Sequence, residues 1–326
     1  MNLANRILVV GPSWVGDMVM AQSLFKVLHL ENPDYEIDVL APSWSLPLIE
    51  RMPEVSKAIN LPFQHGQFKF MKRWFFGLSL KNQYQQVIIL TNSWKSAISP
   101  FSAGITKRTG WVGEYRFGLI NDIRFLDKKR YKKTVERFVA LALPANTELS
   151  HIPFPSLDVK SIERDSTIFH FDVENKKNKL ILGICPGSEV VAKCWTRDGY
   201  AQLANRYLEK NWDIWLFGSE RDKDCCDEIN QWTNNRCKNF SGKTNLLQVI
   251  DLMSICDAVV SNDSGLMHVA AAVNRPLVGI FLCTDPQSTP PLCINNEIIS
   301  RYEKDKNLGV SIDEVDESIQ RVLTRK

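Results

Sequence analysis

The sequence lacks a long apolar run and a strong excess of either charge, and each absence excludes a class of protein. No stretch reaches the roughly 18 apolar residues of a membrane-spanning helix. The apolar start at Ile7–Val10 meets Gly11 and Pro12 too soon for a signal-peptide core. The net charge is only +3, whereas nucleic-acid-binding chains usually carry a larger or more segregated basic excess. We therefore expect a cytoplasmic protein that binds no nucleic acid.

Paired cysteine motifs are also absent. Eight cysteines are present, Cys225 and Cys226 are adjacent, and no pair has the spacing CxxC. A zinc site needs four well-spaced ligands, and none of the five histidines stands near a cysteine in the sequence. Scattered thiols are typical of a reducing compartment. We therefore expect a reducing cytosol and no zinc site.

What is present fits two globular domains. The chain has 326 residues, 44% of them hydrophobic and 24% charged, and two domains of about 150 residues can each bury a core. Basic residues gather in the first half at Lys69–Arg73, Lys107–Arg108 and Lys128–Lys133. Such clusters are either a solvated surface or a face for an anionic substrate or an anionic membrane surface. Composition alone leaves both interpretations open.

Short apolar runs alternate with amphipathic stretches, the pattern of parallel strands connected by helices. In the first half we predict strands at Arg6–Val10, Glu36–Leu40 and Gln86–Thr91, and helices at Met18–Leu30 and Val135–Leu143. In the second half the predicted strands are Leu180–Cys185, Asp213–Phe217, Ala258–Ser261 and Leu277–Phe281. The helices predicted there are Arg197–Lys210, Asp222–Thr233, Leu246–Ile255, Ser264–Val273 and Asp313–Thr324.

The segment Pro144–Asn178 breaks this alternation. It has three prolines, short polar runs and no sustained helical period, so we interpret it as the connection between the domains, with a strand-like stretch at Thr167–Phe171. The predicted fold class is α/β, with two Rossmann-like, doubly wound parallel-sheet domains, residues 1–155 and 156–326, that face a cleft. Ligands in such folds bind at the carboxyl ends of the strands.

The first predicted strand runs directly into Gly11-Pro12-Ser13-Trp14-Val15-Gly16-Asp17. The two glycines bracket a tight strand-to-helix turn, where backbone can pass close to a ligand. The spacing is not the GxGxxG of dinucleotide-binding proteins. Asp17 stands at the start of the next helix, where it could cap that helix or present a carboxylate to the cleft as a general base.

A second polar turn, Ser261–His268, stands where a predicted strand becomes a helix. Its backbone N–H groups and the positive end of the helix dipole would suit a diphosphate. Asp263 and Ser264 could instead cap the helix, and His268 could be a packed core histidine. The position at the carboxyl end of a strand favours a binding role.

Two further strand ends carry polar groups. Pro186-Gly187-Ser188 is followed shortly by Lys193, and a hydroxyl with an ammonium can hold phosphate oxygens and stabilise a departing anion. Phe217–Asp222 ends another strand with two carboxylates. A carboxylate there suits the two hydroxyls of a ribose, although a charged helix start would explain it equally well.

Two other motifs fail on inspection. Gly242-Lys243-Thr244 has the end of a P-loop, but the earlier glycine position is occupied by Cys237, which argues against a nucleoside triphosphatase. Asp222-Lys223-Asp224 matches a DxD metal motif but falls at a predicted helix start. Neither motif predicts a metal site.

These places together resemble the ADP-heptose:lipopolysaccharide heptosyltransferases of glycosyltransferase family 9. Within that family the likeness is to the heptosyltransferase II branch, which adds the second heptose of the inner core. The resembling stretches are Gly11–Met18, Arg51–Val55, Arg108–Trp111, Gly118–Asp122, Asn262–His268 and Thr289–Leu292. The likeness covers most of the chain and is weakest at Pro144–Asn178.

The resemblance implies a GT-B fold and an inverting enzyme with no tightly bound metal or other cofactor. This enzyme would move heptose from ADP-L-glycero-D-manno-heptose to the first heptose of the lipopolysaccharide inner core. By that resemblance Asp17 matches the general base. The donor-binding residues that it implies are Ser188, Lys193, Glu220 or Asp222 for the ribose, Thr244 for the adenine, Asp263, Ser264, Gly265 and His268.

The acceptor implied by the resemblance is the lipid-linked heptosyl-Kdo2-lipid A of a Gram-negative cell. The basic first half would receive this anionic molecule, with peripheral contact at the cytoplasmic face of the inner membrane. The residues we predict to contact the acceptor are Ser13, Trp14, Lys69, Arg73, Lys95 and Arg108.

Departures from the family pattern motivate an alternative. Family members usually have Lys-Arg-Trp-Pro where this chain has Lys193–Thr196, and Gly-Pro-Ser-Ser where it has Leu282–Asp285. Asp285 would place negative charge near a diphosphate. One alternative is therefore a degenerate member that binds sugar nucleotide or a partner without turnover. Another is a Rossmann-type oxidoreductase or epimerase, against which the missing GxGxxG argues.

Overall fold

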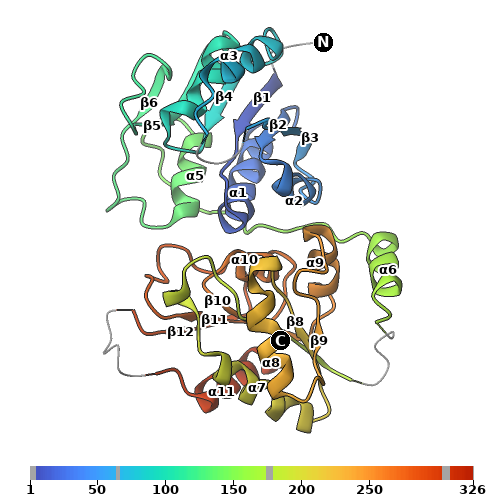
Figure 1. Cartoon of the computed structure of the whole chain (residues 1–326). Helices are drawn as coiled ribbons and strands as arrows, with labels where there is room; N and C mark the ends of the chain where they lie inside the picture. The colour runs from blue at the N-terminus through green and yellow to red at the C-terminus, as the bar shows by residue number, and fades with distance from the viewer. Residues whose placement is uncertain (1–4, 64–66, 174–178, 303–308, 326) are drawn as a thin grey trace. The chain divides into compact units, whose positions relative to one another are not determined.

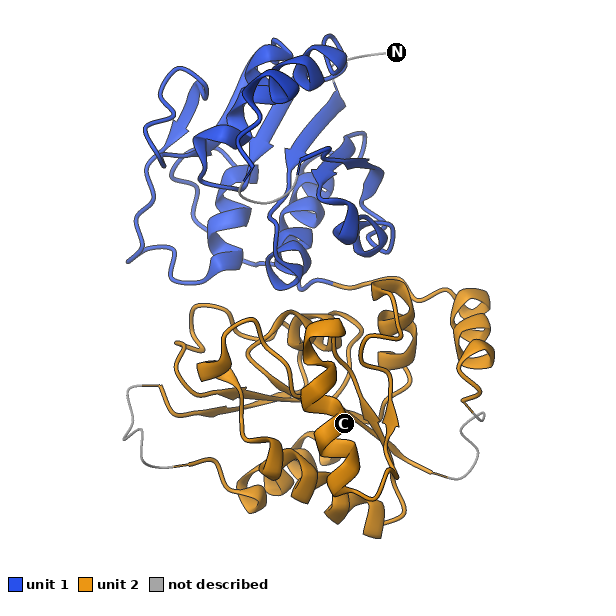
Figure 2. Cartoon of the chain, in the orientation of Figure 1, with its two compact units in different colours: residues 1–155 blue, residues 156–326 orange. Residues whose placement is uncertain are grey.

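Two six-stranded sheets, one in each half of the chain, organise the protein. The computed structural model describes residues 5–63, 67–173, 179–302 and 309–325, and residues 174–178 of the predicted connection lie outside these ranges. The chain divides into unit 1, residues 1–155, and unit 2, residues 156–326 (Figure 2). Both sheets are parallel throughout their paired strands, so each unit is the doubly wound sheet that the sequence predicts.

The sheet of unit 1 has the strand order β3-β2-β1-β4-β5-β6. Its strands are β1 (Arg6–Val10), β2 (Glu36–Ala41), β3 (Val55–Asn60), β4 (Gln86–Ile89), β5 (Lys107–Trp111) and β6 (Asp122–Arg124). The three central strands are short apolar runs whose residues are almost all buried, because helices cover both faces of a parallel sheet. Val10 pairs with Leu40 on one side and with Ile89 on the other, which sets the register at the carboxyl edge.

The helices of unit 1 pack in two groups. They are α1 (Val15–Glu31), α2 (Leu46–Ile49), α3 (Phe70–Ser79), α4 (Ile98–Ser102) and α5 (Thr134–Ala142), with short 3-10 turns η2 (Ser43–Ser45) and η3 (Trp94–Ala97). Helix α1 packs against α5, and α3 packs against α4 (Figure 1). Most of α1 is buried, so the turn that precedes it is held firmly.

Unit 2 repeats the same topology with the order β12-β11-β10-β7-β8-β9. Its strands are β7 (Ile181–Cys185), β8 (Asp213–Leu216), β9 (Lys238–Asn239), β10 (Ala258–Asn262), β11 (Leu277–Phe281) and β12 (Asn296–Ser300). The three strands β7, β10 and β11 are buried at every residue. The first and fourth strands of the unit, β7 and β10, lie side by side at its centre, as β1 and β4 do in unit 1.

Helices flank this second sheet as well. They are α6 (Ser161–His170), α7 (Arg197–Glu209), α8 (Lys223–Trp232), α9 (Leu246–Met253), α10 (Gly265–Ala272) and α11 (Ile312–Thr324), with 3-10 turns η4 (Val191–Lys193) and η5 (Glu220–Asp222). In Figure 1, α9 and α10 lie on one face of the sheet, and α7, α8 and α11 lie on the other. Buried side chains of α7 and α11 join those of the central strands in one hydrophobic core.

The strand predicted at Thr167–Phe171 is wrong, because this stretch belongs to helix α6. The hydroxyl of Thr167 donates to the backbone carbonyl of Glu163 one turn earlier and to the carboxylate of Asp251 on α9. Helix α6 packs against α9, so a tertiary contact overrides the local strand preference of a β-branched and aromatic run.

None of the helices in the described ranges has the length and apolar character that crossing a bilayer requires.

Candidate active site

Three of the predicted functional residues, Asp17, Ser188 and Asp263, lie shortly after central strands of the two sheets. In a doubly wound sheet the chain leaves neighbouring central strands in opposite directions, and the loops at that point form a crevice. This point lies between β1 and β4 in unit 1 and between β7 and β10 in unit 2. The turn before Asp17 follows β1, while Ser188 follows β7 and Asp263 follows β10.

Asp17 lies in the first turn of α1, where it does not take the capping position that the sequence left open. Trp14 occupies the N-cap, and an indole has no oxygen with which to accept from the helix amides. A Cβ at Gly11 would lie 2.6 Å from Cε of Met18, so the side chain of Met18 packs directly on the backbone of this turn. The half-buried Asp17 carboxylate therefore meets the positive end of the α1 dipole.

Arg116, to which the sequence analysis gave no role, braces the loops after β4 and β5. Its guanidinium is almost fully buried and donates to the carbonyl oxygens of Thr91 at 2.6 Å and of Trp111 at 2.6 and 3.1 Å. Burial lowers the pKa of Arg116 to about 10. A buried cation that satisfies two strand-end carbonyls holds the rim of the crevice in one shape. The sequence shows only an arginine in a loop. Such arginines are too common to predict this structural role for Arg116.

Two of the predicted acceptor-binding residues are committed to the fold. Arg73 is buried and donates to the carbonyl oxygens of Phe68 and Gln67, at 2.8 and 2.9 Å. Arg108 donates to the carbonyl oxygen of Leu119 at 2.7 Å and lies over the ring of Phe101. Burial lowers the pKa of both guanidinium groups. Both guanidinium groups stabilise loops through these hydrogen bonds. Only the N–H groups that remain could bind a substrate.

The other four acceptor candidates stand at the surface of unit 1. Trp14 is 53% exposed, Lys69 is exposed at the N-cap of α3, and Ser13 and Lys95 are partly exposed. Ser13 and Trp14 lie in the turn after β1, and Lys95 lies in η3 shortly after β4. Three of the four therefore belong to the two loops of the switch point.

In unit 2 the side chains of Lys193 and Thr284 meet the carboxylate of Asp263, and Ser188 approaches the backbone of the same residue. The ammonium of Lys193 donates to Oδ2 of Asp263 at 2.7 Å, and the hydroxyl of Thr284 donates to the same oxygen at 2.7 Å. The side chain of Asp263 is 6% exposed and that of Lys193 is 24% exposed. The hydroxyl of Ser188 lies 3.5 Å from the carbonyl oxygen of Asp263. Asp263 therefore orients Lys193, and Thr284 supplies a hydroxyl within the stretch that departs from the family pattern.

Asn262 ties the loops of this cluster together, although the sequence analysis assigned it no role of its own. Its fully buried amide accepts from the backbone N–H of Trp195 and the hydroxyl of Tyr200, at 2.9 and 2.8 Å. The same amide donates to the carbonyl oxygen of Pro186 at 2.6 Å. The segment that carries Ser188 and Lys193 is thus pinned on both sides to the end of β10.

Helix α10 begins at this cluster with Gly265, and Ser264 holds its N-cap. The first N–H groups of a helix have no partner within the helix, and within the described residues the Ser264 side chain makes no cap hydrogen bond. His268, one turn into α10, is 4% exposed, and burial lowers its pKa to about 4. A neutral imidazole at neutral pH agrees with the packed-core interpretation of His268 and does not exclude one contact to a bound donor.

The two carboxylates after β8 differ in their surroundings. Oδ2 of Asp222 accepts from both the backbone N–H and the hydroxyl of Ser219, at 2.8 and 2.7 Å, in a capping box. The side chain of Glu220 is 74% exposed, and its Oε2 lies 2.2 Å from where a Cβ on Gly242 would stand. Glu220 therefore lies beside the turn that leads to Thr244, whereas Asp222 serves the local backbone.

The arrangement suits anion binding in unit 2 and proton abstraction in unit 1. An ammonium, hydroxyl groups and a helix N-terminus converge at the switch point of unit 2, which are the groups that bind a diphosphate. Asp285, next to Thr284, accepts from the backbone N–H of Gln287 at 2.8 Å. Within the described ranges, no three His, Cys, Asp or Glu side chains come together as a metal site would need.

Comparison with known proteins identifies relatives along nearly the whole chain. Residues 73–314 match the model of glycosyltransferase family 9 (heptosyltransferase). Lipopolysaccharide heptosyltransferase 2 of Escherichia coli K12 is 42% identical over an alignment of 337 positions, which covers 98% of this chain and 96% of the relative. Lipooligosaccharide heptosyltransferase 2 of Haemophilus influenzae is 44% identical over 308 residues, 91% of this chain and 89% of the relative.

Solved structures show the same likeness. The structure of E. coli ADP-heptose lps heptosyltransferase II has a TM-score of 0.88 at 38% identity and covers 98% of both chains. E. coli heptosyltransferase WaaC with ADP has a TM-score of 0.73 at 17% identity, covering 97% of this chain and 99% of the other. The predicted fold class, two doubly wound α/β domains of the GT-B kind, is confirmed by the first of these.

Proposed function

Because the chain belongs to glycosyltransferase family 9, the heptosyltransferase family, we propose that it transfers heptose from ADP-L-glycero-D-manno-heptose to the first heptose of the lipopolysaccharide inner core. It is a glycosyltransferase, and relatives at 41–45% identity carry the name heptosyltransferase 2. The observation that carries the proposal within the molecule is the anion-binding cluster around Lys193 and the start of α10.

The donor's diphosphate is assigned to unit 2. Lys193 provides the positive charge, and the hydroxyl of Ser188 with the N-terminus of α10 at Ser264 and Gly265 provides hydrogen-bond donors, while the hydroxyl of Thr284 donates to Asp263. Asp263 acts on Lys193 as a positioning residue, because a second anion in direct contact with the diphosphate would repel it.

The nucleoside is assigned to the loops after β8 and β9. The exposed carboxylate of Glu220 is the better candidate for the ribose hydroxyls, since Asp222 already accepts two hydrogen bonds from Ser219. The adenine is assigned to the backbone near Thr244, which follows the glycine against which Glu220 lies.

Asp17 is assigned the role of general base in an inverting displacement. A hydroxyl of the acceptor is a weak nucleophile until a carboxylate removes its proton as the new bond forms. The bond from the anomeric carbon to the diphosphate oxygen breaks, the bond to the acceptor oxygen forms, and ADP leaves with the electron pair. The Asp17 carboxylate, in the first turn of α1, takes the proton that the acceptor hydroxyl loses.

The leaving ADP gains negative charge, which the cluster in unit 2 is placed to stabilise. One preorganised donor of this kind is worth about 3–4 kcal/mol in comparable sites. We propose that Lys193 and the α10 dipole do this without a tightly bound metal ion. Transfer that persists in a chelator such as EDTA would support that assignment, and loss of transfer that Mg²⁺ restores would contradict it.

The acceptor is assigned to the carboxyl edge of unit 1. The exposed Trp14 offers a face for a sugar ring, and Ser13 and Lys95 stand in the neighbouring loops. Lys69 adds a positive charge toward a phosphorylated inner core. A lipid-linked acceptor places the reaction at the cytoplasmic face of the inner membrane, with the protein in peripheral contact.

The deciding experiment measures ADP release from purified protein, ADP-heptose and mono-heptosylated Kdo-lipid A. We expect release that depends on the acceptor, and a fall in kcat by a factor of about 10² or more in Asp17→Asn, with ADP affinity unchanged. Glu31→Gln, at the other end of α1, is the matched control and should keep full activity.

Each outcome separates the alternatives. Near-normal turnover in Asp17→Asn would remove Asp17 as the base. ADP binding by the intact protein without any transfer would favour the degenerate, binding-only member. Transfer only to a different acceptor would keep the glycosyltransferase and replace the proposed acceptor.

A further inference from the structure

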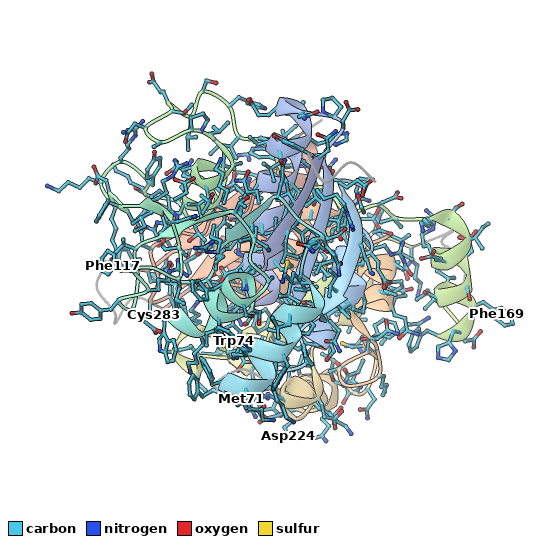
Figure 3. The ribbon with its side chains drawn as sticks, turned by 90° about the horizontal axis from the view of Figure 1, so that it is seen from above. Met71, Trp74, Phe117, Phe169, Asp224 and Cys283 are labelled. Carbon is cyan, nitrogen blue, oxygen red and sulfur yellow. The ribbon has the colours of Figure 1, made fainter. Side chains whose placement is uncertain are left out.

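Helix α3 exposes the side chains that a helix in a globular protein usually buries. Met71 and Phe75 are 59% and 60% exposed, and Leu78 one turn later is also exposed. Figure 3 shows Met71 and Trp74 on this helix in the view from above. We call the exposed apolar residues of this region the α3 surface: Phe68, Phe70, Met71, Phe75, Leu78 and Phe101. Several large apolar side chains exposed on one helix are typical of an interaction site.

The opposite side of α3 is fixed against α4, so the direction of the exposed face is built in. A Cβ at Gly77 would lie 1.9 Å from Oγ of Ser102 and 2.3 Å from the carbonyl oxygen of Ser99, which shows how closely the two helices approach. The hydroxyls of Ser99 and Ser102 donate to the backbone carbonyls of Arg73 and Trp74. The apolar face is therefore held outward by packing and hydrogen bonds.

The aromatic rings at the start of α3 support one another. Phe68 contacts Trp94 and Phe70 at ring-centroid distances of 5.1 and 6.1 Å, and Trp74 contacts Phe70 and Phe101 at 5.8 and 6.2 Å. Such ring pairs contribute stability beyond the area that they bury. The rings thus form one preorganised row that joins α3 to the loop after β4 and to α4.

The charged residues of the α3 segment itself are all basic, and Glu114 reaches only the far end of the aromatic row, where it accepts from the backbone N–H of Trp94. Between Glu54 and Glu114 the sequence has no Asp or Glu. Lys69 and Lys72 are exposed on α3 and Lys81 just beyond it. Aromatic and aliphatic side chains flanked by lysines are the pattern of an interfacial helix, whose apolar face enters the acyl boundary while lysines reach lipid phosphates. The lysines of the α3 segment therefore favour an anionic partner over an uncharged or basic one.

Helix α6 also exposes apolar residues, but it lacks the basic charge of the α3 segment. Ile162 and Phe169 are 82% and 88% exposed there, and Figure 3 shows Phe169 pointing outward from that helix. Glu163 and Asp165 lie between them on the same helix. Glu163 pairs with Lys160 and Asp165 pairs with Arg164, so the charge on α6 is balanced whereas the α3 segment is basic, and α6 provides an internal control for α3.

We propose that the α3 surface docks on an anionic lipid bilayer, with its apolar side chains in the headgroup–acyl boundary and its lysines on lipid phosphates. The proposal rests on the proposed function only in giving the protein a reason to meet lipid, since the acceptor assigned above is lipid-linked. Binding to lipid itself needs neither donor nor acceptor, so it can be measured separately.

The test is flotation of the full-length protein with vesicles of phosphatidylcholine, with and without about one-third phosphatidylglycerol. We expect binding to the anionic vesicles that weakens with added salt, and little binding to the neutral ones. The triple variant M71S/F75S/L78S should bind at least about tenfold more weakly. Lys72→Glu, which replaces one positive charge by a negative one, should bind at least about fivefold more weakly. The control I162S/F169S on α6 should bind as the unchanged protein does.

Several results would overturn the proposal. They are absence of binding to anionic vesicles, equal binding to neutral ones, or unchanged binding by M71S/F75S/L78S with its thermal unfolding intact. A dimer in light scattering that the same variant dissolves would assign the surface to a second copy of the chain instead. With a water-soluble heptosylated Kdo oligosaccharide as acceptor, the triple variant should keep its kcat. Vesicle binding without transfer in any assay would contradict the proposed function and leave the α3 surface in place.

Discussion

At the end of β8, two carboxylates separated by one residue meet different surroundings. Asp222 closes a capping box with Ser219, and its Oδ1 lies 2.1 Å from where a Cβ on Gly187 would stand. Glu220 extends toward Gly242 and stays mostly exposed. The position after β8 is therefore shared between a residue that holds the loop and a residue that is available to a ligand.

Glu220→Ala is expected to weaken ADP binding about tenfold or more, because a hydrogen bond to a charged group contributes about 1.5–3 kcal/mol. Its free energy of unfolding should not change. Asp222→Ala is expected to lower the free energy of unfolding by about 1 kcal/mol through the lost cap and to leave the affinity of the folded protein unchanged. Titration calorimetry and urea unfolding measure the two quantities, and the reverse pattern would exchange the two roles.

His268 makes the stability of unit 2 depend on pH. Burial lowers its pKa to about 4 from the ordinary 6.5, so the unfolded chain takes up the proton first as the pH falls. The stabilisation is complete above the unfolded pKa and is lost as the pH falls from about 6.5 to about 4, at roughly 1.4 kcal/mol per pH unit.

Between pH 7 and pH 5, unfolding in urea should show the unchanged protein losing about 2 kcal/mol more stability than His268→Gln. The exposed His29 on α1 provides the control, and His29→Gln should keep the pH dependence of the unchanged protein. Equal slopes for all three proteins would show that His268 is not held neutral by burial.

The sequence could predict where in the fold the candidate residues lie. It could not predict which of their side chains are free to contact a ligand. Strand ends in a doubly wound fold bind ligands, and that rule pointed to the turns that carry Asp17, Ser188 and Asp263. Which side chain meets a ligand depends on contacts between segments far apart in the chain. The carbonyls that occupy Arg73 and the hydroxyls that reach Asp222 and Asp263 are contacts of this kind.

At the scale of elements, the packing of α3 on α4 depends on Gly77, which has no side chain at the point where the two helices approach most closely. Gly77→Ala would force a methyl group into the backbone of Ser99 and the hydroxyl of Ser102, and overpacking of this kind costs about 1–3 kcal/mol. We expect a lower midpoint of thermal unfolding. Gly309→Ala, with no atom of the described residues within 4 Å of the added carbon, should melt as the unchanged protein does. Equal melting of both variants would mean that the helices separate at little cost.

Helix α6 shows where local pattern misleads. The run Thr167-Ile168-Phe169 has strand propensity, and its helical form depends on the buried hydrogen bond from Thr167 to Asp251 and on packing against α9. The partner is 84 residues away in the sequence. No window along the chain could contain that information, whereas the central strands, which are buried runs of their own residues, were predicted nearly to their ends.

At the scale of the molecule, both units have the order in which the first and fourth strands are central. Short right-handed connections between parallel strands leave few other orders, so the fold class follows from the alternation of runs alone. The same strand order gives each unit its own switch point, so the acceptor and the donor are assigned to different units. The carboxylate assigned to the acceptor belongs to unit 1, and the charges assigned to the donor belong to unit 2.

This division predicts where ADP acts when it binds alone. At about 100 times its dissociation constant, a ligand stabilises the folded state by about 2.7 kcal/mol, which slows local opening at its contacts about 100-fold. Hydrogen exchange should therefore slow in the loops that carry Ser188, Lys193, Glu220, Thr244 and Gly265, and stay unchanged in the turn before Asp17. Asp17→Asn should give the same map, because removing the base leaves the anion site intact. Protection centred on the turn after β1 would instead assign the nucleotide to unit 1, and the donor and acceptor roles of the two crevices would have to be exchanged.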